Sequence, residues 1–490
     1  MTLVSIEFLA LLLPIAFLLY IVCGKTARGQ NIVLLLASAV FYGCYDLKYL
    51  IILAASIAVT YLGGYIGSKQ QDKIKAGKIY SAALILNLLL LVIFKYTNFI
   101  LGNVNTLLGI FGVSITLPKI LLPVGLSFYV FQSSTYLMDL KSGKAEPEYD
   151  IVNYALFVSF FPTIVSGPIL RAASFLPQIR ARRQVTFERF QIFAFTFLWG
   201  AFLKMVMSDR MVGFTAHVFS RYYDYGGAVM FVHTALAMLQ LYIDFMGYSY
   251  MAIGTAALFG FDIPENFHQP WFATSVAGMW RRWHISMTSW FTDYLYIPLG
   301  GSRRGTLRKY FNTLLVFTVS GLWHGPAWTF ALWGFISAFY MVVGQITMPY
   351  RLKLSSKLGI DRETFGYKMF QRFITFWLIA PLVVIFSVSS LKEAAVYFRN
   401  MLTVWNPWVL FDGSLCDMGM SATDWKVIIF SGIILLAVSA LRENGYDCKF
   451  IVKQNAAFKT LLGLTLFFAI MIFGMYGAQF SASAFVYAGF

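Results

Sequence analysis

The chain has 490 residues, of which 59% are hydrophobic and 12% are charged, and its net charge is +16 at pH 7. A soluble domain of this size carries about twice that share of charged residues, so the composition excludes a soluble globular protein and indicates a polytopic membrane protein. We attribute the excess of lysine and arginine to membrane topology and to anionic lipid headgroups rather than to nucleic acid.

Apolar stretches near the roughly 20 residues needed to cross a bilayer begin with residues 4–23. That stretch has no basic region before it and no small-residue cleavage site after it, so we expect a retained transmembrane helix and not a signal peptide. The runs at 226–261 and 311–345 are long enough for two passes each. In all we expect roughly eleven to thirteen membrane-embedded segments. The remaining runs are 31–45, 48–67, 80–101, 119–138, 151–170, 190–208, 368–388, 426–441 and 460–477.

Lysine and arginine residues gather in short loops, which the positive-inside rule assigns to the cytoplasmic side. The loop 102–118 carries no charge and is expected on the outside, and the polar stretches 346–367 and 389–425 are expected to be loops on opposite faces. Because no long polar region separates the apolar stretches, we predict one membrane domain over residues 1–490. The basic loops contain Lys25 and Arg28; Lys69, Lys73, Lys75 and Lys78; Lys141 and Lys144; Arg180, Arg182, Arg183 and Arg189; Arg303, Arg304, Arg308 and Lys309; and Arg351, Lys353, Lys357 and Arg362.

The stretch "MWRRWHISMTSWFTDYLYIPLGG", residues 279–301, is neither an apolar span nor a polar loop. Its apolar residues recur every three or four positions, which predicts one amphipathic helix in or near the membrane interface. Pro298, Gly300 and Gly301 are expected to end it. His284 shares the apolar face, so its imidazole is expected to point toward protein or lipid. The apolar face comprises Trp280, Trp283, His284, Met287, Phe291, Tyr294 and Leu295.

The stretch "SGLWHGPAWTFALWG", residues 320–334, places His324 inside an apolar run. An ionisable side chain at membrane depth costs roughly 2.5 to 3.5 kcal/mol, so it indicates a functional site. Gly321, Gly325 and Pro326 permit non-helical backbone, which inside a membrane is buried in protein or lines a watery cavity. A neutral histidine on a cavity wall suits general-base removal of a hydroxyl or thiol proton. A structural histidine bonded to a neighbouring carbonyl explains the spacing equally well.

A second ionisable group, Asp244, lies in the apolar run "LYIDFMGYSYMAIG". Its carboxylate is expected to bond a backbone amide near Gly247 or to pair with a cation such as Arg281 or Lys204, and we favour this structural role over a catalytic one. No GxSxG, HExxH or Walker A motif occurs, and no histidine or cysteine pair has metal-ligand spacing. The sequence therefore predicts no metal site and does not favour a serine hydrolase, a metalloprotease or a nucleotide-driven pump.

Taken together, the two quoted stretches resemble the signature region of the membrane-bound O-acyltransferase (MBOAT) family, in its bacterial alginate O-acetylation (AlgI-like) branch. Upstream matches follow in order: "LPVGLSFYVFQSSTYLMDL", "FFPTIVSGPILRAASFLPQI", the run around Asp244 and "ENFHQPW". The resemblance extends over about residues 30–340, with its signature region at about 120–340, and includes an aromatic ending at Phe485 to Phe490.

The resemblance implies an all-α integral membrane protein with about eleven transmembrane helices and re-entrant and interfacial helices around a central funnel. It implies an O-acyltransferase, multi-pass in the bacterial cytoplasmic (inner) membrane, with His324 as general base and His284 as the second catalytic histidine. The basic face beside them suits an acyl donor's phosphates or an acidic carrier protein, although membrane charge explains those arginines equally well. The candidate substrate- or donor-binding residues are Arg281, Arg282, Trp283, Trp323, Asp244 and Asn266.

In this reading a short acyl group, acetyl, leaves a cytoplasmic thioester and reaches an extracytoplasmic polysaccharide of the alginate, cellulose or peptidoglycan type. The donor is acetyl-CoA or an acyl carrier protein, no cofactor stays bound, and a separate extracytoplasmic acetyltransferase is the expected partner beside membrane lipid. The alternative is a proton-coupled transporter or flippase in which His324 and Asp244 relay protons at the midplane.

Overall fold

A computed structural model describes residues 1–118 and 120–476, and the aromatic ending Phe485–Phe490 lies outside these residues. Every regular element in the described ranges is helical, so the predicted all-α class is confirmed. The helices pack into two compact units. The first contains Met1–Phe197 and Tyr248–Pro264, and the second contains Leu198–Gly247 and the described residues from Glu265 to Tyr476. Two of the boundaries fall inside helices, α9 (Phe187–Ala201) and α11 (Gly227–Leu258), and the third follows Pro264.

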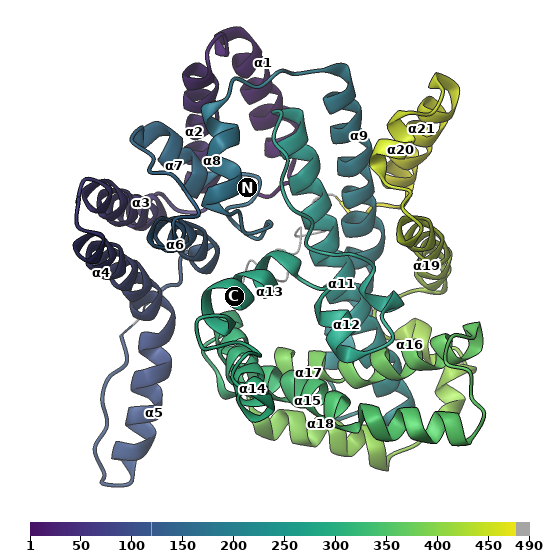
Figure 1. Ribbon diagram of the computed structural model, residues 1–490. Helices are drawn as coiled ribbons and strands as arrows, with labels where there is room; N and C mark the ends of the chain where they lie inside the picture. The colour runs from purple at the N-terminus through teal and green to yellow at the C-terminus, as the bar shows by residue number, and fades with distance from the viewer. Residues whose placement is uncertain (119, 477–490) are drawn as a thin grey trace. The chain divides into compact units, whose positions relative to one another are not determined.

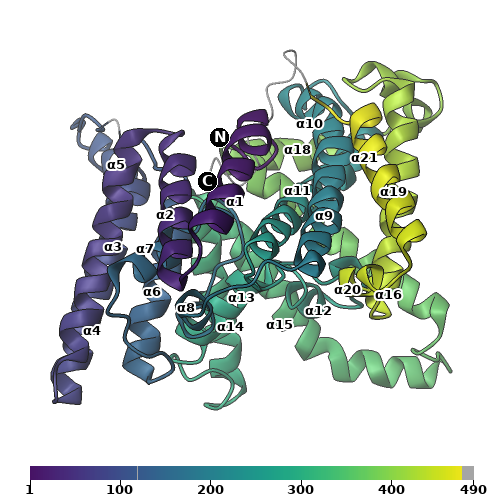
Figure 2. The same cartoon turned by 90° about the horizontal axis from the view of Figure 1, so that it is seen from above.

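In the first unit, α3 and α4 run side by side and α6 packs against both (Figures 1 and 2). Aspartates begin three of its helices: the carboxylates of Asp46, Asp72 and Asp150 each accept the backbone N–H two residues further on. Such caps satisfy amides that have no partner inside the helix. The helices of this unit are α1 (Leu13–Cys23), α2 (Ala27–Gly43), α3 (Leu47–Ser68), α4 (Lys73–Leu91), α5 (Thr97–Gly109), α6 (Leu126–Ser142), α7 (Ile151–Ser159) and α8 (Ala172–Arg180).

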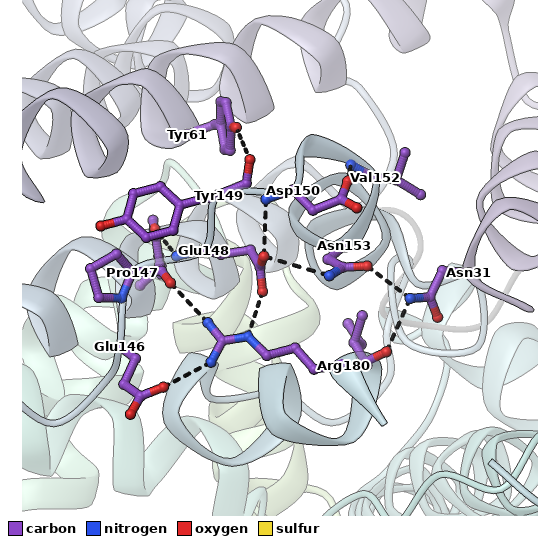
Figure 3. A network of polar contacts seen from close by, with 12 residues as sticks. Asn31, Tyr61, Glu146, Pro147, Glu148, Tyr149, Asp150, Val152, Asn153 and Arg180 are labelled. Carbon is purple, nitrogen blue, oxygen red and sulfur yellow. Dashed lines mark hydrogen bonds and ion pairs between the residues drawn. The ribbon is translucent and has the colours of Figure 1, made fainter. Parts of the chain in front are cut away.

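Arg180, the last residue of α8, organises a polar network in this unit (Figure 3). Its guanidinium donates to the carboxylate of Glu148 at 2.8 Å and to that of Glu146 at 3.0 Å. Burial by itself lowers the pKa of Arg180, but the hydrogen bonds and charges of the two glutamates outweigh it and raise the pKa above its ordinary value. The segment before α7 is therefore tied to the end of α8.

The second unit holds α14 and α15 as an antiparallel pair, with α12 and α17 packed against α15. Four π-helical turns interrupt the helices of the two units: Phe8–Leu12, Val92–Tyr96, Phe202–Ser208 and Thr292–Tyr296. The helices of the second unit are α10 (Asp209–Ser220), α12 (Val276–Trp280), α13 (Ile285–Phe291), α14 (Thr306–His324), α15 (Trp328–Lys357), α16 (Phe365–Ile379), α17 (Leu382–Ser387), α18 (Leu391–Thr403), α19 (Ala422–Glu443), α20 (Cys448–Val452) and α21 (Ala456–Phe473).

Within the described residues, eight helices are long and apolar enough to cross a membrane, and Phe8–Cys23 is a shorter apolar helix. On α21, large apolar side chains such as Leu461 and Ile472 are more than two thirds exposed. A water-soluble protein does not expose helices of this kind, whereas lipid covers them. The eight spans are Leu47–Ser68, Lys73–Gly109, Phe187–Ser220, Gly227–Leu258, Trp328–Lys357, Phe365–Ser387, Ala422–Glu443 and Ala456–Phe473.

The two longest apolar runs fold differently. The run 311–345 is divided between α14 and α15, because Gly325 and Pro326 interrupt it, but of the two only α15 is among the helices long and apolar enough to cross a membrane. The run 226–261 forms one continuous helix, α11, so the expectation of two passes there is wrong: it contains no proline that would break the helix. The expected loop 346–367 is also helical as far as Lys357.

Candidate active site

The two histidines that the sequence singled out lie close together in the second unit. His284 begins α13, His324 ends α14, and the centroids of their rings are 6.3 Å apart. Both side chains are buried, with 0% and 2% of their surface exposed. Aromatic rings surround them: Phe245 and Trp323 lie at 4.6 and 6.1 Å from His284, and Trp323, Trp333 and Phe386 lie at 4.9, 5.2 and 5.4 Å from His324. We call this group the histidine–aromatic cluster.

A tight turn between two closely packed helices places His324. α14 ends at His324, and Gly325 and Ala327, on either side of Pro326, have extended backbones before α15 begins. A Cβ atom at Gly321 would overlap the carbonyl oxygen of Phe330, and one at Gly334 would overlap that of Phe317. The glycines therefore let the two backbones approach.

The segment 279–301 is not the single helix that its periodicity predicts. α12 ends at Trp280, a turn follows, and α13 begins only at Ile285, before the π-helical turn Thr292–Tyr296. The backbone of His284 is left-handed, with φ 44° and ψ 52°, which breaks the helix. The predicted apolar face is nevertheless buried at Trp280, Trp283, His284, Met287 and Phe291. Periodicity identified the inward face and missed the break.

Asn266, a predicted substrate contact, instead caps α13. Its backbone carbonyl accepts the N–H of Ile285 at 2.9 Å. Its side-chain oxygen accepts the hydroxyl of Ser286 at 2.6 Å and the Ser286 N–H at 3.4 Å. These bonds hold the residues that directly follow His284.

Burial determines the charge of His284. In the sequence, this residue lies after the candidate span Gly227–Leu258 and before the candidate span Trp328–Lys357. Removal from water lowers the pKa of His284 to about 3, because an imidazolium ion is poorly solvated among aromatic rings. At neutral pH the side chain is therefore a neutral imidazole that can hydrogen-bond without adding a positive charge.

Asp244 lies in a buried ion cluster beside the aromatic residues of α11. The ammonium of Lys204 is 2.6 Å from Asp244 and 2.8 Å from Asp209, and the hydroxyl of Ser208 donates to Asp244 at 3.2 Å. Of the partners that the sequence suggested, the structure confirms Lys204. Lys204 and Ser208 belong to the π-helical turn Phe202–Ser208, a kind of interruption that often marks functional positions in helices.

The remaining predicted residues divide into wall residues and outward-facing residues. Trp283 packs against Tyr242 and Phe267 at 5.6 and 5.1 Å, and Trp323 lies beside both histidines. Arg281 is exposed, as are Arg303 and Arg304. The guanidinium of Arg282 forms two hydrogen bonds with the Glu443 carboxylate, at 2.7 and 3.0 Å. Sequence reasoning missed Phe245, Phe386 and Glu443 because no motif or periodic pattern links them to the histidines.

The sequence around this cluster matches a known family of membrane proteins. Residues 145–389, which contain both histidines, match the profile of the membrane-bound O-acyltransferase family, MBOAT. The chain belongs to the membrane-bound O-acyltransferase family. It is accordingly an acyltransferase and an integral membrane protein.

Named relatives of this acyltransferase include bacterial O-acetylating proteins. It is 34% identical over 407 residues to a protein of Azotobacter vinelandii named "Probable alginate O-acetylase AlgI", covering 83% of this chain and 78% of the relative. The protein of that name in Pseudomonas aeruginosa is 32% identical over 433 residues, covering 87% and 80%. A "Peptidoglycan O-acetyltransferase" of Helicobacter pylori is 30% identical over 451 residues, covering 85% and 82%.

Proposed function

We propose that this acyltransferase moves an acetyl group from a cytoplasmic thioester toward a hydroxyl acceptor outside the membrane, for O-acetylation of a polysaccharide. The observation that carries the proposal is the buried His284–His324 pair, whose ring centroids are 6.3 Å apart inside an aromatic wall. The relatives that span most of the chain support acetyl as the acyl group and an alginate- or peptidoglycan-type polymer as the acceptor.

In the proposed reaction, His324 removes the proton of the acceptor hydroxyl as its oxygen attacks the thioester carbonyl carbon. The carbon–sulfur bond then breaks, the ester forms, and the thiolate leaving group takes up a proton. A neutral imidazole is suited to this task near pH 7. His284 orients the acyl group or assists the proton transfer. Exclusion of water by the aromatic wall protects the thioester from hydrolysis and strengthens dipoles that face the reacting carbonyl.

The basic loops support the finer assignment of sidedness and donor. By the positive-inside rule they are expected in the cytoplasm, where acetyl-CoA and acyl carrier proteins are found, and this supports a location in the bacterial inner membrane. The proposal also includes about eleven membrane passes around a central funnel and no bound cofactor. A separate extracytoplasmic acetyltransferase is the proposed partner. Exposed Arg281 and Arg303 are the cations best placed to meet a phosphate-bearing donor.

Sided membrane vesicles test this direction of transfer. Inside-out and right-side-out vesicles from polymer-producing cells receive acetyl-labelled acetyl-CoA, which does not cross membranes, or a labelled carrier protein. We expect label to reach the polysaccharide only in inside-out vesicles that contain the protein. Equal consumption of the donor by right-side-out vesicles would contradict the proposal.

The pairing of Asp244 argues against the transporter alternative, in which this residue is the second relay group. Asp244 is held by Lys204 at 2.6 Å and by Ser208 at 3.2 Å, which is the pairing expected of a buried carboxylate with a structural role. Together with membership in an acyltransferase family, this pairing favours the enzyme.

A further inference from the structure

His284 directly precedes α13, but its side chain does not cap this helix. The residue in this position ordinarily turns its side chain back to accept an N–H of the first turn. The carbonyl of His284 does accept the N–H groups of Met287 and Thr288 at 3.0 Å each, but its side chain makes no capping hydrogen bond. The ring lies instead 4.6 Å from that of Phe245, edge to face. The left-handed backbone of His284 is also rare for a residue with a side chain.

Asn266 supplies the missing cap from another segment. Its two oxygens accept the N–H groups of Ile285 and Ser286 and the hydroxyl of Ser286. Asn266 and Ser286 are both buried, so solvent does not compete for these bonds. Because the first amides of α13 are satisfied by Asn266, the imidazole of His284 is left to face His324.

Further contacts fasten the two segments to each other. The N–H of His268 donates to the carbonyl of Arg282 at 3.0 Å, directly before the turn at His284. The guanidinium of Arg282 then pairs with Glu443, the last residue of α19, at 2.7 and 3.0 Å. The neighbouring Arg442 pairs with Glu265 at 2.6 Å, one residue before Asn266.

The end of α19 therefore contacts both segments: Glu443 pairs with Arg282, and Arg442 pairs with Glu265. All four charged side chains are partly buried, with exposed fractions from 16% to 43%. α19 lies beyond residues 145–389, which match the family profile.

We propose that Asn266 and the Arg282–Glu443 ion pair are positioning residues, which hold the imidazole of His284 toward His324 for acyl transfer. The inference rests on the proposed function in one respect, that the histidine pair is the place of reaction. It reassigns Arg282 from contact with the donor to support of the neighbouring histidine.

Asn266→Ala tests the cap in the purified full-length protein in nanodiscs, with labelled acetyl-CoA or an acetylated carrier protein as the probe. A misplaced catalytic group costs about ten- to a hundredfold in rate, so kcat is expected to fall by that factor while KM changes less than about twofold. The matched control is Ser390→Ala, which removes the cap of α18 and leaves the site untouched. It is expected to keep the wild-type kcat.

Hydrogen exchange gives a readout that does not need activity. Amides 285–288 are expected to exchange faster in Asn266→Ala, while those of α18 are unchanged. In a His284→Ala background the Asn266 substitution is expected to add little further loss of rate, since the effect passes through the histidine. Wild-type exchange and wild-type kcat in Asn266→Ala would overturn the proposal.

A charge exchange tests the ion pair. Arg282→Glu and Glu443→Arg are each expected to lower kcat, and the double variant is expected to recover to within about threefold of the wild type. If Arg282 instead contacts the donor, the KM is expected to rise in Arg282→Glu and in the double variant, and the second substitution would not restore it. That result would contradict the proposal. The control is the same exchange at the exposed pair Lys368–Glu363, 2.7 Å apart, which is expected to change nothing.

The two hypotheses fail in different ways. Full activity in His284→Ala would refute the role of the histidine pair in the proposed function. An impaired His284→Ala together with an unimpaired Asn266→Ala would leave the histidine's role intact and would refute positioning by Asn266.

Discussion

Removing Lys204 is expected to destabilise the second unit more than removing either carboxylate that it binds. The Lys204 ammonium lies between Asp244 at 2.6 Å and Asp209 at 2.8 Å, and the three side chains are 2%, 1% and 10% exposed. Lys204→Met removes the ammonium that lies between the carboxylates of Asp244 and Asp209. Asp244→Asn leaves Lys204 paired with Asp209, so one balanced ion pair remains.

The expected magnitudes follow from this asymmetry. Breaking a buried ion pair by removing one partner costs about 3–5 kcal/mol of unfolding free energy. The cost of Lys204→Met is expected near the upper end of this range, because two carboxylates lose the ammonium that they share. Asp244→Asn loses charge-assisted hydrogen bonds only, which costs about 1.5–3 kcal/mol. At roughly 2 °C per kcal/mol for a large domain, the two variants separate by several degrees.

Thermal unfolding in detergent or nanodiscs, with acyl transfer measured beside it, checks this order. Lys204→Met is expected to have the lowest Tm, and Lys204→Met with Asp244→Asn is expected to regain at least half of the loss. Lys368→Met, at an exposed ion pair, serves as the control and should stay close to the wild type. A wild-type Tm for Lys204→Met, or an Asp244→Asn protein that keeps its Tm and loses all activity, would refute the structural interpretation and favour a relay.

Three further variants probe the packing, the polar network and the titration described above. Gly321→Ala is expected to lower the Tm and the activity, at a cost of about 1–3 kcal/mol or more, because its Cβ overlaps the Phe330 carbonyl, whereas Gly344→Ala meets open space and should be tolerated. Glu148→Ala, which removes the buried partner of Arg180 and leaves it with Glu146 and the carbonyl of Pro147, is expected to cost about 1.5–3 kcal/mol, and Glu146→Ala at an 86% exposed side chain under about 1 kcal/mol; equal Tm values would contradict this. Because burial lowers the pKa of His284 to about 3 from an ordinary 6.5, its contribution to stability is complete above pH 6.5 and is lost as the pH falls from 6.5 toward 3. The wild type should therefore lose more Tm than His284→Gln between pH 7 and pH 4.5, and parallel losses would contradict the shift.

The sequence predicted the features that repeat locally. Hydrophobic runs predicted a helical membrane protein, and periodicity around Trp280, Trp283 and Met287 identified the buried face. The rule that a buried charge needs a partner suggested several partners for Asp244, and Lys204 was one of them. These predictions depend on neighbours a few residues apart or on charge balance, both of which are visible in one sequence.

Long-range contacts and backbone breaks were not visible in that way. The Arg282–Glu443 pair joins residues 161 positions apart, and neither belongs to a pattern that indicates the other. The left-handed turn at His284 contains no glycine that would mark it in the sequence. The bond that holds the following residue comes from Asn266, which lies in another segment. The uninterrupted α11 shows the opposite error, since length alone suggested two passes where nothing breaks the helix.

The central claim is that His324 removes the acceptor proton during acyl transfer. The most direct measurement compares wild type with His324→Ala, at equal abundance and equal Tm, for loss of label from whichever thioester the wild type consumes. We expect the variant to lose at least about a hundredfold in kcat, the range of general-base contributions, with little change in KM. Transfer by His324→Ala at the wild-type rate would contradict the account.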